Sequence, residues 1–202
     1  MEERQATASA VEIERPTWDA TQVRVLDAAD ELIVRRGMHG VTIAELARRA
    51  GLSRPTVYRS WSDADDVVRA ALLRRMAGII ALFEERPSTR AELVDDVLRF
   101  SGLFRADAVY GQLLSEEPEA FTRYTLQRVG SSQRMILQWL ADAIRTAQAG
   151  GTVRDADPTG ISVMLLLVAQ SAVLSRGTVS DLLPEETWER ELRAALDGLL
   201  RP

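Results

Sequence analysis

The chain has 202 residues, of which 46% are hydrophobic and 27% are charged, and its formal net charge is −5. This length and apolar fraction fit one large or two small domains with a real core, and they exclude a disordered chain. The absence of cysteine excludes a disulfide scaffold, thiolate zinc sites, iron–sulfur clusters and cysteine nucleophiles. A single histidine, His39, argues against a histidine-based triad or a multi-histidine metal site. All 25 basic residues are arginine.

The first 17 residues carry four glutamates and two arginines without an apolar run, unlike a signal peptide. We predict that residues 1–17 form a flexible arm. It is either a leader without function or a segment that contacts a DNA minor groove through Arg4 or Arg15. The longest apolar run, Val163–Ala169, is far shorter than the roughly 20 residues of a membrane-spanning helix. We therefore expect a soluble, cytoplasmic protein without a membrane partner.

Helical periodicity dominates the sequence and no segment alternates as a strand does, so we predict an all-α fold of about nine helices. The first helix is predicted over Ala20–Gly37, with the glycine as a left-handed stop. Thr42 begins the second helix, and Glu45 lies at the spacing of a capping box. Gly51 ends that helix.

Ser53 is predicted to cap a third helix, with Pro55 in its first turn, where a missing N–H breaks no helical bond. Six further helices with buried apolar stripes complete the prediction. They are expected at 63–85, from a capping box at 89 to beyond 104, at 108–116, at 118–149 with a bend at 130–132, at 157–175 and at 184–200.

The helix, glycine turn and helix over Thr42–Ser60 have the spacing of a helix-turn-helix, whose second helix fits the major groove of DNA. This segment carries four arginines and one glutamate, a local balance of +3, and both flanks are net acidic. Phosphate binding depends on local charge, so the net −5 does not exclude DNA. An ordinary helical hairpin with a solvated face is the alternative for this segment alone.

The chain resembles the DNA-binding domain of TetR-family repressors over about 50 residues, and the residues that carry the resemblance lie between Val25 and Trp61. Beyond about Ala70, only the helix layout and the total length are similar to the family. The resemblance implies a helix-turn-helix domain over residues 18–64 and a ligand-binding and dimerisation domain over residues 65–202. It rests on Val25-Leu26-Asp27-Ala28-Ala29, Gly37, Thr42-Ile43-Ala44-Glu45-Leu46-Ala47, Ala50-Gly51-Leu52-Ser53, Val57-Tyr58 and Trp61.

The resemblance implies roles for groove-facing residues of the second helix. Arg54 and Arg59 would read bases, because arginine can bind guanine through two hydrogen bonds. Thr56 would contact a thymine methyl group, and Pro55 would contribute only shape. The full expected DNA-binding set is Thr42, Ser53, Arg54, Pro55, Thr56, Tyr58 and Arg59.

Phosphate binding is implied for Thr42 and Tyr58 through their hydroxyl groups, and for Ser53 at the start of the recognition helix. Two positions depart from the family: Ser60 stands where histidine is frequent, and Ala64 where lysine is frequent. A phosphate contact is therefore expected to be missing. The nearby carboxylates, at positions 63, 65 and 66, are expected to stabilise a helix N-terminus and not to bind metal.

Apolar and aromatic residues beyond residue 93 are expected to line a ligand pocket between helices. The helix over 158–175 is apolar nearly all round, so one side is expected to face a partner chain. With the helix over 184–200 it would form the two-fold interface of a homodimer. A central core helix in a monomer is the alternative. The ligand-binding candidates are Phe100, Phe104, Tyr110, Leu114, Phe121, Tyr124, Arg128, Trp139, Met164 and Gln170.

These observations favour a homodimeric, ligand-responsive transcriptional regulator, a repressor released from a palindromic operator in double-stranded DNA by a small, mostly hydrophobic effector. No cofactor or metal is expected. One alternative is a helix-turn-helix protein that acts through protein partners. The other is an enzyme, against which the lone His39 and the absence of cysteine and of a phosphate-binding loop argue.

Overall fold

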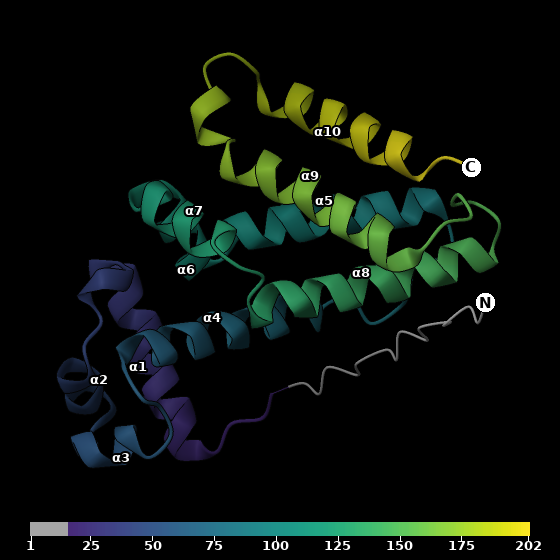
Figure 1. Cartoon of the computed structure of the whole chain (residues 1–202). Coiled ribbons are helices and arrows are strands. Elements are labelled where there is room, and N and C mark those ends of the chain that lie inside the picture. The colour runs from purple at the N-terminus through teal and green to yellow at the C-terminus, as the bar shows by residue number, and fades with distance from the viewer. Residues whose placement is uncertain (1–15) are drawn as a thin grey trace, which may run out of the picture.

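The computed structural model describes residues 16–202, and all regular structure in that range is helical, as predicted (Figure 1). The predicted arm, with Arg4 and Arg15, lies outside the described residues except for positions 16 and 17. The α-helices are α1 (Ala20–Arg36), α2 (Ile43–Ala50), α3 (Arg54–Tyr58), α4 (Ala64–Ile80), α5 (Arg90–Ala106), α6 (Ala108–Glu116), α7 (Pro118–Leu126), α8 (Ser131–Ala149), α9 (Pro158–Leu174) and α10 (Glu185–Leu200). Short 3₁₀ turns cover Met38–Gly40 and Gly177–Val179.

Side-chain caps begin α2, α3 and α4 at the predicted residues. Thr42, Ser53 and Asp63 each accept a hydrogen bond from the backbone N–H three residues further on. The predicted capping box at Thr42 is wrong in its second half. The Glu45 carboxylate does not return to the backbone of Thr42, because it binds the guanidinium of Arg48 at 2.6 Å. The first hydrogen bond of the box, from Glu45 N to Thr42 Oγ1, is present at 3.3 Å.

The capping box at the start of α5 is confirmed in both directions. Thr89 Oγ1 accepts from Glu92 N at 3.2 Å, and Glu92 Oε2 accepts from Thr89 N at 3.2 Å. The preceding helix, α4, ends at Ile80 and not near residue 85 as predicted. The chain turns there and buries Phe83 against Trp139, with 5.0 Å between the ring centroids.

The single helix predicted over 118–149 is two helices, which makes ten α-helices in the described range where about nine were predicted. The break covers residues 127–130. Its last residue, Gly130, has extended backbone angles. Gln133 supplies the polar contacts there: its Oε1 accepts from Gly130 N, and its Nε2 donates to the Thr125 carbonyl, both at 3.0 Å. A side chain therefore supports a break that the prediction gave only as a bend.

The helices form a small group, α1–α3, and a larger group, α5–α10, with α4 leading from one into the other (Figure 1). In the larger group α8 packs along α9, and α10 packs against α9 and α5. One apolar core runs through both groups, from Leu26 and Leu46 at one end to Ile144 and Leu165 at the other. Burial of this core is the main force that holds the recognition helix and the larger group in one structure.

Candidate DNA-binding surface and ligand cavity

The predicted helix-turn-helix is formed by α2, a tight turn at Gly51, and α3. Gly51 has φ +64°, a left-handed conformation that glycine adopts without strain. Arg24 of α1 donates a hydrogen bond to the Ala50 carbonyl and holds the turn against α1. Val57 is fully buried and fixes the inner side of α3 on the core. The opposite side of α3 is therefore presented outward.

Six of the seven predicted DNA-binding residues are exposed. Thr56 is half-buried, with its hydroxyl 2.8 Å from that of Ser53. Tyr58 is 55% exposed, which is unusual for a large aromatic side chain. Arg54 and Arg59 form no ion pair and no side-chain hydrogen bond within residues 16–202. The exposed residues are Thr42, Ser53, Arg54, Pro55, Tyr58 and Arg59.

The two arginines of α2 are already bound to carboxylates, so they add little to the free positive charge. Arg48 binds Glu45 through two nitrogens, at 2.6 and 3.1 Å, and this hydrogen bonding lowers the pKa of Glu45. Arg49 binds Glu31 of α1 at 2.6 Å. The local balance of +3 expected from the sequence is thus offset by a carboxylate from outside the segment. The uncommitted positive charge lies on α3.

A cavity of about 840 Å³ lies between α4 and helices α5–α9. Eight of the ten predicted ligand-binding residues line it, namely Phe100, Phe104, Tyr110, Phe121, Tyr124, Arg128, Trp139 and Gln170. Leu114 and Met164 lie outside it, so the structure does not support them as ligand contacts. Met164 is 45% exposed on the outer face of α9, and Leu114 of α6 packs partly exposed against the core.

One wall of the cavity belongs to α4, a helix that was not predicted to line the pocket. Val68, Leu72, Leu73 and Met76 of that helix line the cavity. The signal was present, because Val68, Leu72 and Met76 recur at helical spacing on a face predicted to be buried. A buried stripe predicts contact with the interior, but it does not tell whether the neighbour is a side chain or a cavity.

Aromatic rings form a continuous floor in this cavity. Phe104 lies 4.2 Å from Tyr110 and 6.3 Å from Phe121 between ring centroids, and Phe100 stacks on Trp139 at 5.5 Å. The Tyr110 hydroxyl donates to the Leu72 carbonyl at 2.6 Å, and burial raises the pKa of Tyr110 well above its usual range. Because this hydroxyl is bonded to α4, it fastens α6 to α4.

A network of ion pairs joins α4 to the helices on both sides of it. Arg75 of α4 binds Asp30 of α1 at 2.9 Å and Asp107, the N-cap of α6, at 2.6 Å. Arg74 also binds Asp30, at 2.9 Å. We call this set, together with the hydrogen bond from Tyr110 to Leu72, the α4 joint. It connects the cavity wall to α1, on which α2 packs, and α2 in turn packs against α3.

Within residues 16–202, no group of histidine and carboxylate side chains has the arrangement of a metal site. None of the helices in the same range has the length and apolar content needed to cross a bilayer.

Comparison with known proteins connects this geometry to a family. The model of a family described as bacterial regulatory proteins, tetR family, matches residues 25–71. An uncharacterized HTH-type transcriptional regulator of Mycobacterium tuberculosis is 34% identical over 177 residues, which are 88% of this chain and 93% of the relative. The HTH-type transcriptional regulator UidR of Escherichia coli is 24% identical, over 89% of this chain and 93% of UidR.

Solved structures share the same fold. FadR of Bacillus subtilis, solved in complex with stearoyl-CoA, matches with a TM-score of 0.62 at 18% identity, covering 88% of this chain and 97% of FadR. The matched relatives are transcriptional regulators and not enzymes, and the same holds for this chain. The match at 25–71 spans the helices that form the helix-turn-helix. The chain belongs to the TetR family of bacterial regulatory proteins and is a transcriptional regulator with a DNA-binding helix-turn-helix.

Proposed function

We propose that this regulator is a homodimeric, cytoplasmic repressor that is released from a palindromic operator by a small, mostly hydrophobic effector. Residues 18–64 bind the operator, and residues 65–202 hold the effector and the dimer interface. FadR, a structural neighbour, was solved with stearoyl-CoA, which supports a ligand with a large apolar part in this fold.

The surface of α3 supports operator binding. Arg54 and Arg59 are exposed and uncommitted, so their guanidinium groups are available to guanine edges in the major groove. Thr42 and Tyr58 flank them with exposed hydroxyl groups that suit phosphate oxygens. Two copies of α3, related by a two-fold axis, would then bind two equivalent half-sites.

An exposed apolar strip on α9 supports the homodimer. Val163, Met164 and Leu167 are 38%, 45% and 50% exposed, and α10 packs beside this helix. Two copies would bring four helices together across a two-fold axis. Leu167→Glu is expected to convert a dimer into a monomer in sedimentation equilibrium at micromolar concentration. A wild-type protein that is itself monomeric would contradict this part of the proposal.

The position of α4 supports communication between effector and operator. Its apolar face lines the cavity, and the α4 joint ties the same helix to α1. An effector that fits only one arrangement of α4 would favour one spacing of the two recognition helices. Release follows if the operator prefers a different spacing, because a ligand shifts an equilibrium only through its differential affinity for the two states.

The observation that carries the proposal is that one helix, α4, both lines a cavity of about 840 Å³ and bonds to the helix that supports α2 and α3. The test is selection of bound sequences from random double-stranded DNA by the purified protein. We expect an enriched palindrome with two half-sites, and an affinity for it that falls steeply with salt. Failure to enrich any sequence at low salt would favour action through protein partners.

A further inference from the structure

We propose that the effector is an amphipathic organic anion. Its apolar body lies on the aromatic floor of the cavity, and its acidic group lies at a rim formed by Arg128, Arg134 and the first turn of α8. This inference rests on the proposed function, in which the cavity is the effector site. The apolar lining residues by themselves predict only a mostly hydrophobic effector, and this inference adds a negative charge to it.

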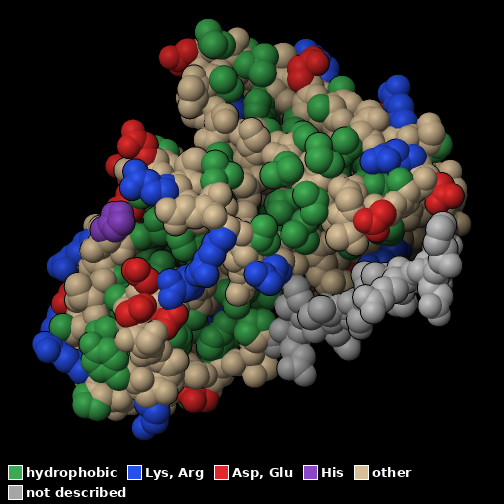
Figure 2. Space-filling model, viewed as in Figure 1, with side chains coloured by type: hydrophobic (Ala, Val, Ile, Leu, Met, Phe, Trp, Pro, Cys, Tyr) green, Lys and Arg blue, Asp and Glu red, His purple; other side chains and the backbone are tan. Residues whose placement is uncertain are grey.

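The rim of the cavity is positively charged, although the chain as a whole is acidic. Asp66, one of its two aspartates, is bound by Ser62 and by Arg69, so that aspartate and its arginine neutralise each other. On the face shown in Figure 2, blue side chains gather where α4 approaches the connection between α7 and α8, with green apolar side chains and a group of red acidic ones next to them. The charged rim residues are Arg69, Arg123, Arg128 and Arg134 against Asp65 and Asp66.

Three of these arginines have no carboxylate partner in the described part of the chain. Arg123 and Arg128 form no ion pair or side-chain hydrogen bond within residues 16–202, and Arg134 donates only to the Val129 carbonyl, at 3.3 Å. Most other described arginines bind a carboxylate. An uncommitted guanidinium retains its full capacity for charge-assisted hydrogen bonds to an anion.

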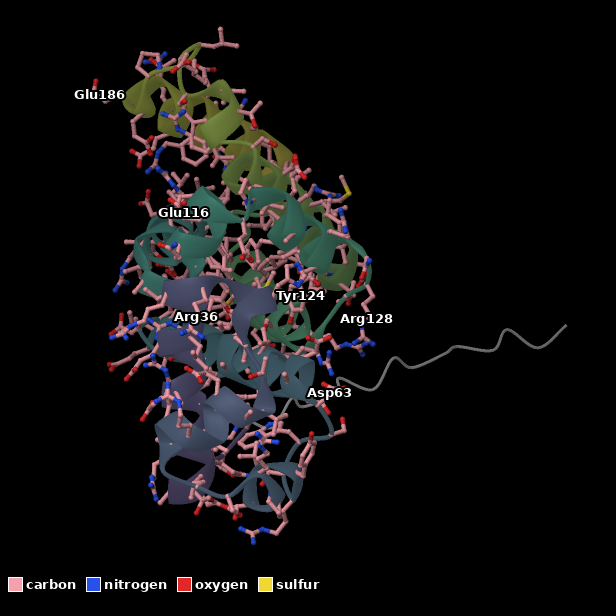
Figure 3. The ribbon with its side chains drawn as sticks, turned by 90° about the vertical axis from the view of Figure 1, so that its left-hand side faces the viewer. Arg36, Asp63, Glu116, Tyr124, Arg128 and Glu186 are labelled. Carbon is pink, nitrogen blue, oxygen red and sulfur yellow. The ribbon has the colours of Figure 1, made fainter. Side chains whose placement is uncertain are left out.

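The charge of Arg128 acts on the interior of the cavity as well as on solvent. Figure 3 shows Tyr124 within the body of the molecule and Arg128 further out at its edge. Burial raises the pKa of the Tyr124 hydroxyl, and the positive charges of Arg69 and Arg128 oppose that rise. A ligand that reaches from the aromatic floor past Tyr124 therefore meets this positive charge.

The floor contains a hydrogen-bond donor that lacks an acceptor. Trp139 is only 3% exposed and lines the cavity, and its Nε1 has no hydrogen-bond partner among the described residues. Buried donors are rarely left unsatisfied in a folded protein. This nitrogen is itself buried, so a ligand reaches it only if neighbouring side chains move, and the anionic assignment rests on the arginines of the rim instead.

The start of α8 reinforces the positive rim. Its N-cap is Gly130, which has no side chain to accept a hydrogen bond from the first turn. Gly130, Ser131 and Ser132 all line the cavity. The first backbone N–H groups of a helix have no partner within the helix, and together with the helix dipole they favour an anion. Arg134 lies in the same first turn and adds its own charge.

Two fluorescent probes with the same aromatic rings test the proposal on the full-length protein. 1-Anilinonaphthalene-8-sulfonate carries a sulfonate, and N-phenyl-1-naphthylamine is its neutral counterpart. We expect the double variant R128Q/R134Q to bind the sulfonate probe about tenfold more weakly and the neutral probe with less than a twofold change. R145Q, at an exposed arginine of α8 that pairs with Asp142 of the same helix and does not line the cavity, is the matched control and should change neither.

The outcomes separate this inference from the proposed function. If the two probes compete for one site but R128Q/R134Q leaves the sulfonate affinity unchanged, the anionic assignment is overturned and the effector cavity stands. If the sulfonate probe fails to displace the neutral probe, it binds elsewhere and the assignment is overturned as well. If neither probe binds, both the assignment and the effector cavity are contradicted, while operator selection still tests DNA binding independently.

Discussion

Arginine has two different roles in two regions of this molecule, the α4 joint and the outer surface of α3. In the joint, Arg75 is bonded on both sides, to Asp30 at 2.9 Å and to Asp107 at 2.6 Å. On α3, Arg54 and Arg59 are exposed and have no such partner within residues 16–202. Since the chain has no lysine, residue type alone cannot separate the roles. The carboxylates around each arginine decide whether it joins helices or remains available to an outside anion.

The ion pairs of the α4 joint hold helices together, but burying their charges also costs free energy. Burial raises the pKa of Asp30 although Arg75 and Arg74 oppose that rise, and Asp30 Oδ1 has no hydrogen-bond partner in the described chain. Desolvation therefore offsets much of the attraction between these charges. The joint fixes the position of α4 more than it adds net stability, but removal of one partner leaves a charge buried without compensation.

Arg75→Met is expected to have the largest effect on stability, because it leaves Asp107 without its ion pair and Asp30 with Arg74 alone. Loss of one partner of a partly buried pair should lower the free energy of unfolding by about 2–3 kcal/mol. Urea unfolding measures this change. Arg145→Met, at the exposed pair with Asp142 within α8, is the control and should stay within about 0.5 kcal/mol of wild type. Equal effects of the two variants would contradict the distinction between joint and surface.

Arg54→Ala and Arg59→Ala are expected to have the reverse profile, with weaker DNA binding and unchanged stability. Each should lower the affinity for the selected operator by about tenfold, and at least one should relax base preference. Fluorescence anisotropy with the operator and with single-base variants measures both. Arg145→Ala, on α8, should bind as wild type does. If neither arginine variant changes affinity or preference, α3 does not read the groove through these residues.

Local features of the fold were predictable from sequence because their partners lie within a few residues. Ser53 and Asp63 cap helices through the backbone three residues away, and such bonds leave a short-range signature. The break between α7 and α8 was predicted only as a bend, because it depends on Gln133. That side chain bonds Gly130 and Thr125 but also Gln170 of α9, which is distant in sequence.

The residues of the DNA-binding surface were easier to predict than those of the cavity, because fewer of them depend on contacts between distant parts of the sequence. Arg49 counted as free positive charge until the fold brought Glu31 of another helix within 2.6 Å of it. Met164 was expected in the cavity as one of several apolar residues, but it lies outside it, on a helix that is apolar nearly all round. Such a helix has no polar side to show which face turns outward. The short, mixed α2 and α3 carry that information, and six of the seven residues predicted there to bind DNA are exposed, whereas Thr56 is half-buried.

Tyr110→Phe tests the one uncharged contact of the α4 joint, the hydrogen bond from Tyr110 to Leu72. The change removes the hydroxyl that donates to the Leu72 carbonyl at 2.6 Å and leaves the ring in place. We expect the free energy of unfolding to fall by about 1 kcal/mol, the net value of one intramolecular hydrogen bond. Tyr124→Phe is the control, since that hydroxyl has no hydrogen-bond partner within residues 16–202 and should cost less. Equal losses would mean that the bond to α4 contributes nothing specific.

Asp66→Asn is expected to have the smallest effect on the free energy of unfolding. Asp66 pairs with Arg69 of the same helix, α4. The Ser62 hydroxyl and Arg69 lower the pKa of Asp66 from 3.8 to about 2. A carboxylate whose pKa is lowered on folding stabilises the protein above its unfolded pKa, and this contribution disappears as pH falls through the folded pKa. The stability difference between wild type and Asp66→Asn should therefore shrink between about pH 4 and pH 2.

Ser62→Ala should move this loss to higher pH, because it removes the contact that lowers the pKa of Asp66 most. Urea unfolding across this pH range measures both effects, and a difference that does not change with pH would show that Asp66 and Arg69 do not act as a pair in solution.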